Sequence, residues 1–142
     1  MKRLSRIAAL DIGDVRIGVA VCDETQMTVN PVSTYTRTGS IKADVRAIEE
    51  LLNELNASIV VIGNPLDKDE KVGAQAQKVK EFADRLSRRL RIEVVMWDER
   101  YTTSDALEML IEHDVSRKKR KEVVDQAAAV LILESYLQEK RS

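Results

Sequence analysis

Three carboxylates interrupt apolar segments of the chain at positions where they could do chemistry. Asp11 lies near the end of the first apolar run, Glu99 directly follows a later run, and Asp125 lies early in a third. Carboxylates brought together repel one another, so a cluster is tolerated mainly where divalent cations neutralise the charge. Oxygen ligands favour Mg²⁺ or Mn²⁺, and two such ions about 4 Å apart can stabilise the attacking and leaving oxygens of a phosphodiester displacement. The three acids therefore predict a shared metal site.

These acids and their neighbours also have structural interpretations. Asp11 can accept hydrogen bonds from backbone N–H groups of the turn at Gly13, as aspartate commonly does. Asp125 can stabilise a helix N-terminus through the helix dipole, and Asp98, beside Glu99, can form a surface pair. Taken singly, these interpretations fit the sequence as well as a site does. The joint placement at element ends favours a site, because a crevice opens at the carboxyl ends of parallel strands.

The elements that must position the acids follow from hydrophobic periodicity. Apolar runs on either side of Gly13 predict a β-hairpin, and Pro31 confines a third strand, Met27 to Thr36, to an edge or an irregular start. The remaining predicted elements are a helix capped by Ser40 (41–55), a buried strand (58–63), a helix (74–90), a strand (91–97), a helix from Thr102 to His113 and a helix that is apolar almost all round (123–137). This order predicts an α/β fold in which a mixed sheet has an antiparallel and a parallel half, with helices on both faces.

Length and composition restrict the class of protein. The 142 residues predict one domain, residues 1–142, and 44% hydrophobic with 33% charged residues is typical of a globular protein. No apolar run reaches the roughly 20 residues of a membrane span, and Asp11 interrupts the early run that a signal peptide would need, so we expect a cytoplasmic protein without a membrane partner. The single cysteine, Cys22, and the single histidine, His113, exclude a zinc cage within one chain. Dinucleotide and phosphate-loop glycine motifs are absent from the sequence.

The charge distribution contains two basic clusters. The net charge of −1 argues against a uniformly basic nucleic-acid binder. Basic residues nevertheless gather at Arg85, Arg88, Arg89 and Arg91, and again from Arg117 to Lys121. Such runs are usually solvated surface. Because the second run lies shortly before Asp125, Lys118, Lys119 and Arg120 are our candidates for holding a nucleic-acid backbone.

Four motifs in order carry a resemblance to a known family. They are Leu10–Gly13 with Arg16–Ala20, Gly63–Leu66, Asp98–Thr103 and Asp125–Ala129. Over nearly its whole length the chain resembles the YqgF or RuvX family, described as Holliday junction resolvases or pre-16S ribosomal RNA nucleases. The resemblance implies a ribonuclease H-like fold with a five-stranded mixed sheet, a metal-dependent nuclease activity, and a role in maturing the 5′ end of small-subunit ribosomal RNA.

The resemblance also implies roles for individual residues. Asp11, Glu99 and Asp125 match the acids expected to hold Mg²⁺ or Mn²⁺, while Arg16, Arg100 and Thr102 in the same motifs are expected to contact nucleic acid. The chain departs from the family's pattern in two places. Glu70 lies in the loop after Pro65 where a glycine is common, and the strand Ile59–Ile62 lacks the acid that typical resolvases of this fold carry.

Together, the residues and the resemblance predict a metal-dependent endonuclease. The resemblance implies that it acts on RNA, with Asp11 as the bridging ligand, Glu99 and Asp125 completing the site, and water as the nucleophile. Two alternatives stay open. A Holliday junction DNA resolvase would act as a homodimer, because two symmetric strands must be cut. A ribosome-biogenesis factor would bind RNA without cleaving it.

Overall fold

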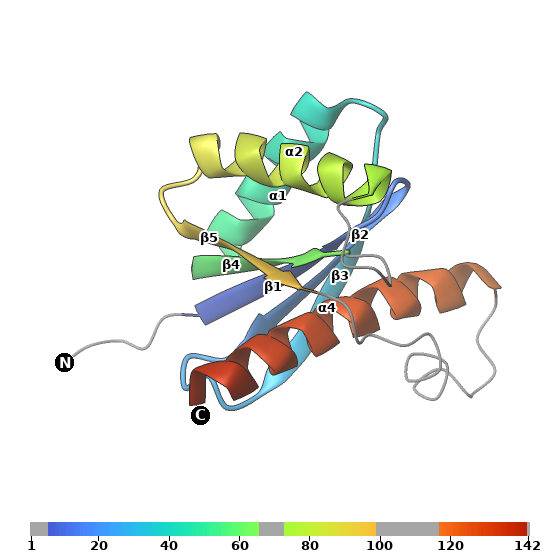
Figure 1. Ribbon diagram of the computed structural model, residues 1–142. Helices are drawn as coiled ribbons and strands as arrows, with labels where there is room; N and C mark the ends of the chain where they lie inside the picture. The colour runs from blue at the N-terminus through green and yellow to red at the C-terminus, as the bar shows by residue number, and fades with distance from the viewer. Residues whose placement is uncertain (1–5, 66–72, 99–116, 142) are drawn as a thin grey trace.

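The computed structural model describes residues 6–65, 73–98 and 117–141 of the chain (Figure 1). The predicted helix from Thr102 to His113 lies outside these residues. In chain order the elements are β1 (Arg6–Ile12), β2 (Arg16–Cys22), β3 (Val29–Thr36), α1 (Ile41–Glu54), β4 (Ala57–Asn64), α2 (Ala74–Arg89), β5 (Glu93–Asp98) and α4 (Arg117–Arg141).

The five strands form one mixed sheet in the order β3-β2-β1-β4-β5. β1 pairs antiparallel with β2, and β2 with β3, whereas β1 pairs parallel with β4, and β4 with β5. The predicted antiparallel and parallel halves are therefore confirmed. Pro31 lies on the edge strand β3 at a shift of the pairing register, as its missing N–H requires. Figure 1 shows α1 and α2 on one face of the sheet and α4 on the other, which confirms that helices cover both faces.

A hydrophobic core fills the space on each side of the sheet. Leu10 and Ile12 of β1 belong to the core beneath α1 and α2, whereas Ile7 and Ala9 belong to the core beneath α4. Side chains alternate between the two faces of a strand. Asp11 therefore continues the Ile7 and Ala9 series and lies on the α4 face, at the carboxyl end of β1.

Helix α4 differs from its prediction in length and in burial. It begins at Arg117 rather than Val123, so the basic run forms its first turns, and it continues to Arg141. Lysine and arginine are good helix formers, which explains why the helix includes the run. The apolar pattern of residues 123–137 predicts a buried helix, and this is wrong for one face of it: Glu134 and Ser135 are exposed, while Ile132 and Leu133 pack on the sheet. None of the described helices is long and apolar enough to cross a membrane.

Asp44 of α1 is a fully buried carboxylate that the sequence analysis did not identify. It accepts hydrogen bonds of 3.0 Å from the Tyr35 hydroxyl, Arg37 Nε, and both the N–H and the hydroxyl of Thr38. Burial alone would raise the pKa of Asp44, but these hydrogen bonds outweigh burial and hold the pKa below its usual range. Asp44 is thus an ionised, fully bonded group in the first turn of α1.

Arg37 connects this carboxylate to the turn between β1 and β2. Its Nη1 donates to the Gly13 carbonyl at 2.9 Å, and its backbone N–H donates to the Val15 carbonyl at 2.8 Å. The guanidinium also lies 5.3 Å from the centre of the Phe82 ring of α2, a cation–π contact. Arg37 and Asp44 therefore fix the turn that separates Asp11 from β2.

We predict that Asp44→Asn lowers the free energy of unfolding by about 3 kcal/mol at pH 7, because it leaves the largely buried Arg37 guanidinium without its counter-charge. Because folding lowers the pKa of Asp44, its contribution is complete above the unfolded value of about 4 and is lost as the pH falls through the folded value. Urea unfolding at several pH values measures this. Asp84→Asn, an exposed helical aspartate, is the control, and equal midpoints for the two variants at pH 7 would contradict the account.

Candidate active site

Asp11 is half-buried at the carboxyl end of β1, and its carboxylate makes no hydrogen bond or ion pair with the residues that the structure describes. The turn that follows is closed by its own backbone, since the Gly13 N–H donates to the Arg16 carbonyl at 2.9 Å. Burial, followed by the nearby charge of Asp125, raises the pKa of Asp11 to about 6. The described hydrogen bonds do not support the structural interpretation, in which the Asp11 carboxylate binds backbone N–H groups of the turn.

Asp23 illustrates what a turn-binding aspartate looks like in this fold. Its carboxylate accepts from the Met27 N–H at 2.9 Å, the Thr28 N–H at 3.2 Å and the Thr25 hydroxyl at 2.8 Å. Hydrogen bonds, that of Thr25 first, lower the pKa of Asp23 to about 2. Asp23 and Asp44 are both satisfied carboxylates with lowered pKa values, whereas Asp11 has no described hydrogen-bond partner and a raised pKa.

Gly18 determines where Asp125 lies. It pairs with Asp11 across the β1–β2 ladder, and a Cβ atom added to it would lie 1.9 Å from the Asp125 carbonyl oxygen. The backbone of α4 therefore contacts the backbone of β2 at this point, which only glycine permits. The Gln126 amide holds the same turn of helix by donating to the Thr34 hydroxyl of β3 at 3.1 Å. These contacts place Asp125 on the same face of the sheet as Asp11.

Arg16 is the cation of this site among the described residues. Its Nε donates to Oδ2 of Asp125 at 2.7 Å, and the two side chains are 28% and 19% exposed. The sequence analysis assigned Arg16 to nucleic acid and did not foresee this ion pair. The described part of the site thus contains two carboxylates and one guanidinium.

The other predicted site residues are not placed by the structure. Glu99, Arg100 and Thr102 lie outside the described residues, after β5 ends at Asp98. The backbones of Lys118, Lys119 and Arg120 belong to the first turns of α4, but their side chains are not described. Within residues 6–65, 73–98 and 117–141 no group of three or more acidic, histidine or cysteine side chains could hold a metal ion. The convergence of three carboxylates stays a prediction.

The residues present nevertheless fit a hard divalent cation. Asp11 offers carboxylate oxygens without a hydrogen-bond partner in the described part of the chain, and the charge of Asp125 acts on it. Paired carboxylates are the donor type that Mg²⁺ and Mn²⁺ prefer. Burial and, after it, the charge of Asp125 raise the pKa of Asp11, and a bound cation would offset that charge.

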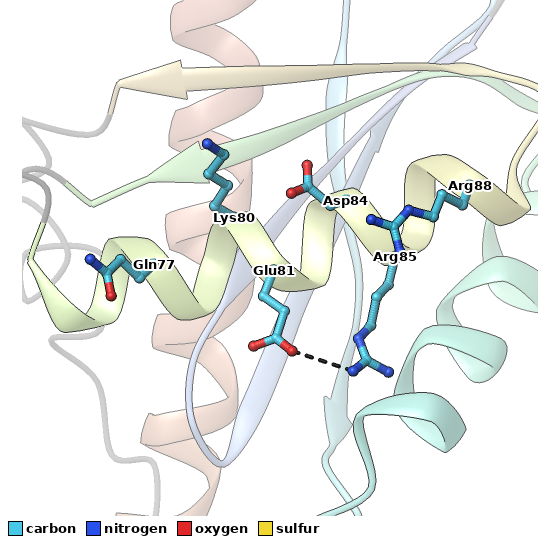
Figure 2. Close-up of a pocket in the computed structure, with 6 residues that line it drawn as sticks. All are labelled: Gln77, Lys80, Glu81, Asp84, Arg85 and Arg88. Carbon is cyan, nitrogen blue, oxygen red and sulfur yellow. Dashed lines mark hydrogen bonds and ion pairs between the residues drawn. The ribbon is translucent and has the colours of Figure 1, made fainter.

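The first basic cluster has a different setting, on α2 and across the sheet from Asp11. Side chains of α2 line a surface cavity of about 620 Å³, drawn in Figure 2: Gln77, Lys80, Glu81, Asp84, Arg85 and Arg88. This stripe contains both cations and carboxylates, and Arg85 pairs with Glu81 at 3.3 Å. Arg89 pairs with Glu49 of α1 at 2.7 Å. The cluster is therefore a mixed-charge helix face rather than a continuous basic surface.

Comparison with known families identifies the chain. A model of the RuvX family, described as Holliday junction resolvase, matches residues 5–139. The chain belongs to the RuvX family. A relative from Clostridium tetani, named "Putative pre-16S rRNA nuclease", is 44% identical over 93% of this chain and 95% of its own length. A relative of the same name from Thermoanaerobacter pseudethanolicus is 40% identical over 96% and 99% of the two chains.

Solved structures confirm the ribonuclease H-like fold. RuvC of T. thermophilus in complex with a Holliday junction substrate matches with a TM-score of 0.59 and 11% identity, over 96% of both chains. A second T. thermophilus RuvC structure matches with the same TM-score of 0.59 and 12% identity. At this identity the similarity concerns the fold alone. It agrees with the mixed five-stranded sheet predicted from the sequence.

We predict that Gly18→Ala lowers the free energy of unfolding by about 3 kcal/mol, because the new methyl group overlaps the α4 backbone, which cannot move without unpacking the helix. Gly73→Ala is the control, since a Cβ there meets nothing within 4 Å. Urea unfolding of the two variants measures the difference. A Gly18→Ala protein as stable as the control would show that α4 does not pack against β2 as described.

We predict a distinct pH dependence for Asp11→Asn in metal-free protein. Because folding raises the pKa of Asp11 to about 6, the folded state holds this proton more tightly, and stability falls as the pH rises from about 4 to above 6. The asparagine variant lacks this loss. Its stability relative to wild type should therefore increase by on the order of 2 kcal/mol between pH 4 and pH 7.5. Unfolding in EDTA measures it, and a relative stability that decreases over this range would contradict the account.

Proposed function

We propose that this protein is a metal-dependent endonuclease that hydrolyses phosphodiester bonds of RNA during maturation of the 5′ end of pre-16S ribosomal RNA. The observation that carries the proposal is the half-buried Asp11 carboxylate, without a partner in the described part of the chain and beside Asp125. The names of relatives at 40–44% identity support the substrate class.

Asp11, Glu99 and Asp125 are the residues proposed to hold Mg²⁺ or Mn²⁺, with Asp11 as the bridging ligand. Glu99 directly follows the last residue of β5, the strand parallel to β4, which is itself parallel to β1. The carboxyl ends of these strands lie at one edge of the sheet, where the crevice of such folds opens. A bound divalent cation would supply Lewis-acid activation of the phosphodiester and of the attacking water.

The protein side chains contribute binding and orientation. In our proposal Arg16, Arg100 and Thr102 contact the nucleic acid near the carboxylates. Lys118, Lys119 and Arg120 bind the backbone further along. Because α4 is continuous from Arg117 through Asp125, the basic run is rigidly connected to the site and lies roughly 10 Å away along the helix axis, at about 1.5 Å per residue.

A DNA junction resolvase is the second candidate, favoured by the description of the RuvX family and by the fold of RuvC. It requires a homodimer, since two symmetric strands must be cut. We propose RNA as the partner because the full-length relatives are named for it. A cytoplasmic location and a single domain over residues 1–142 belong to the same proposal.

The proposal predicts Mn²⁺-dependent cleavage of a pre-16S 5′ RNA segment, with slower or no cleavage of a four-way DNA junction. Asp11→Asn, Glu99→Gln and Asp125→Asn should each reduce the rate by at least about 100-fold, equivalent to roughly 3 kcal/mol of transition-state stabilisation. Asp14→Asn, an exposed aspartate in the adjoining turn, is the matched control and should retain the wild-type rate. Cleavage of the junction alone would favour the resolvase. RNA binding without cleavage would favour the non-catalytic factor.

The basic run of α4 predicts a second, independent result. Each phosphate contact contributes about −0.7 to the slope of log affinity against log salt for a single strand. Changing Lys118, Lys119 and Arg120 together to Gln should flatten the slope by up to about 2 if all three make contacts. RNA binding in Ca²⁺ over a range of salt concentrations measures it. Changing Lys80, Arg85 and Arg88 of α2 together to Gln is the control. If the salt slope of the α4 variant is unchanged, the basic run is only solvated surface and does not contact phosphates.

A further inference from the structure

The Arg16 guanidinium is only partly used by its ion pair with Asp125. An arginine carries five N–H donors on three nitrogens, and the bond to Asp125 at 2.7 Å uses Nε. Neither terminal nitrogen makes a hydrogen bond with the described residues. With 28% of the side chain exposed, these donors remain accessible to a ligand.

The ion pair also neutralises only one of the two carboxylates. The guanidinium lies on Asp125, while Asp11 has no partner among the described residues. One positive charge therefore partly neutralises a site with two negative charges. A divalent cation that binds both carboxylates brings a second positive charge next to the guanidinium, and the two cations compete for Asp125.

The backbone around Arg16 restricts movement to its side chain. Its carbonyl closes the turn by accepting from the Gly13 N–H, and the neighbouring Val15 carbonyl accepts from the Arg37 N–H at 2.8 Å. Ile17, the next residue, is fully buried in the core under α1 and α2. The guanidinium can consequently exchange partners without a change in the strand that carries it.

We propose that Arg16 is a switch that couples the metal site to phosphate binding. In the metal-free protein its guanidinium neutralises Asp125. When a divalent cation binds Asp11 and Asp125, Arg16 is released and its planar fork binds a phosphate of the nucleic acid, the geometry for which guanidinium is suited. The proposal rests on the metal site of the proposed function and adds the identity of the group that the metal displaces.

Because thermodynamic linkage is reciprocal, the coupling between metal and RNA binding can be measured from affinities alone, without turnover. If the metal releases Arg16 for phosphate, metal must raise RNA affinity, and RNA must raise metal affinity by the same factor. Removing Arg16 removes the competitor for the carboxylates. Arg16→Gln should therefore bind Mn²⁺ more tightly in the absence of RNA, by roughly 5-fold or more, and should show a smaller increase in RNA affinity on addition of Ca²⁺ than wild type does.

The experiment compares wild type with Arg16→Gln, Arg89→Gln and Asp11→Asn. Mn²⁺ affinity is measured by calorimetry without RNA, and RNA affinity is measured with and without Ca²⁺. Arg89→Gln is the matched control, because Arg89 also pairs through Nε at 2.7 Å, with Glu49, away from the site. The Arg16 Nε–H signal in the NMR spectrum, assigned by its loss in Arg16→Gln, should shift as Mg²⁺ is added, while the Arg89 signal should not.

The outcomes separate the two proposals. Tighter Mn²⁺ binding by Arg16→Gln, with a shifted Arg16 signal in wild type, supports the switch. Equal or weaker Mn²⁺ binding by Arg16→Gln, or an Arg16 signal that stays unchanged at saturating Mg²⁺, overturns it while leaving the metal site intact. If wild type binds no Mn²⁺, or if Asp11→Asn binds Mn²⁺ as tightly as wild type does, the metal site of the proposed function fails, and the switch fails with it.

Discussion

The close approach of α4 to β2 at Gly18 is the constraint on which the candidate site depends. A Cβ atom at this position would lie 1.9 Å from the Asp125 carbonyl oxygen, so the backbone contact exists only because the residue has no side chain. Gly18 is also the ladder partner of Asp11. One glycine therefore brings an acid from the carboxyl-terminal helix next to an acid of the first strand. The core beneath α4, with Ile132 and Leu133 against Ile7, holds the helix in this position.

The aspartates of this fold lie in two kinds of environment. Asp44 and Asp23 are surrounded by donors that lower their pKa values, and both stabilise a local turn or helix start. Asp11 has a raised pKa and no partner in the described part of the chain, so at neutral pH its charge costs stability. The described residues leave no fully buried side-chain polar atom without a hydrogen-bond partner. A cost such as that of Asp11 in this setting usually marks a functional position. The Arg37–Asp44 pair supports this position by fixing the turn between Asp11 and Arg16.

Local patterns predicted much of the fold, whereas contacts between distant segments decided the details of the site. The β-branched run of β4 and the N-cap of α1 were readable because period and capping are local properties. Ser40 does accept from the Ala43 N–H, at 3.2 Å. The start of α4 was wrong because a charged run continues a helix as readily as it ends one. Gly18, inside an apolar strand, was a readable signal of close backbone approach that the sequence analysis did not use. The Arg37–Asp44 and Arg16–Asp125 pairs depend on how β3, α1 and α4 pack, which no local pattern contains.

The central claim is that Asp11 and Asp125 hold a divalent cation together. A crystal structure of the protein soaked in Mn²⁺, with anomalous difference density collected near the manganese edge, tests it most directly. The account predicts an anomalous peak within about 2.2 Å of an oxygen of each carboxylate, at the carboxyl end of β1 and beside Gly18. A structure with no peak at Asp11, and with manganese bound only elsewhere on the surface, would contradict the account.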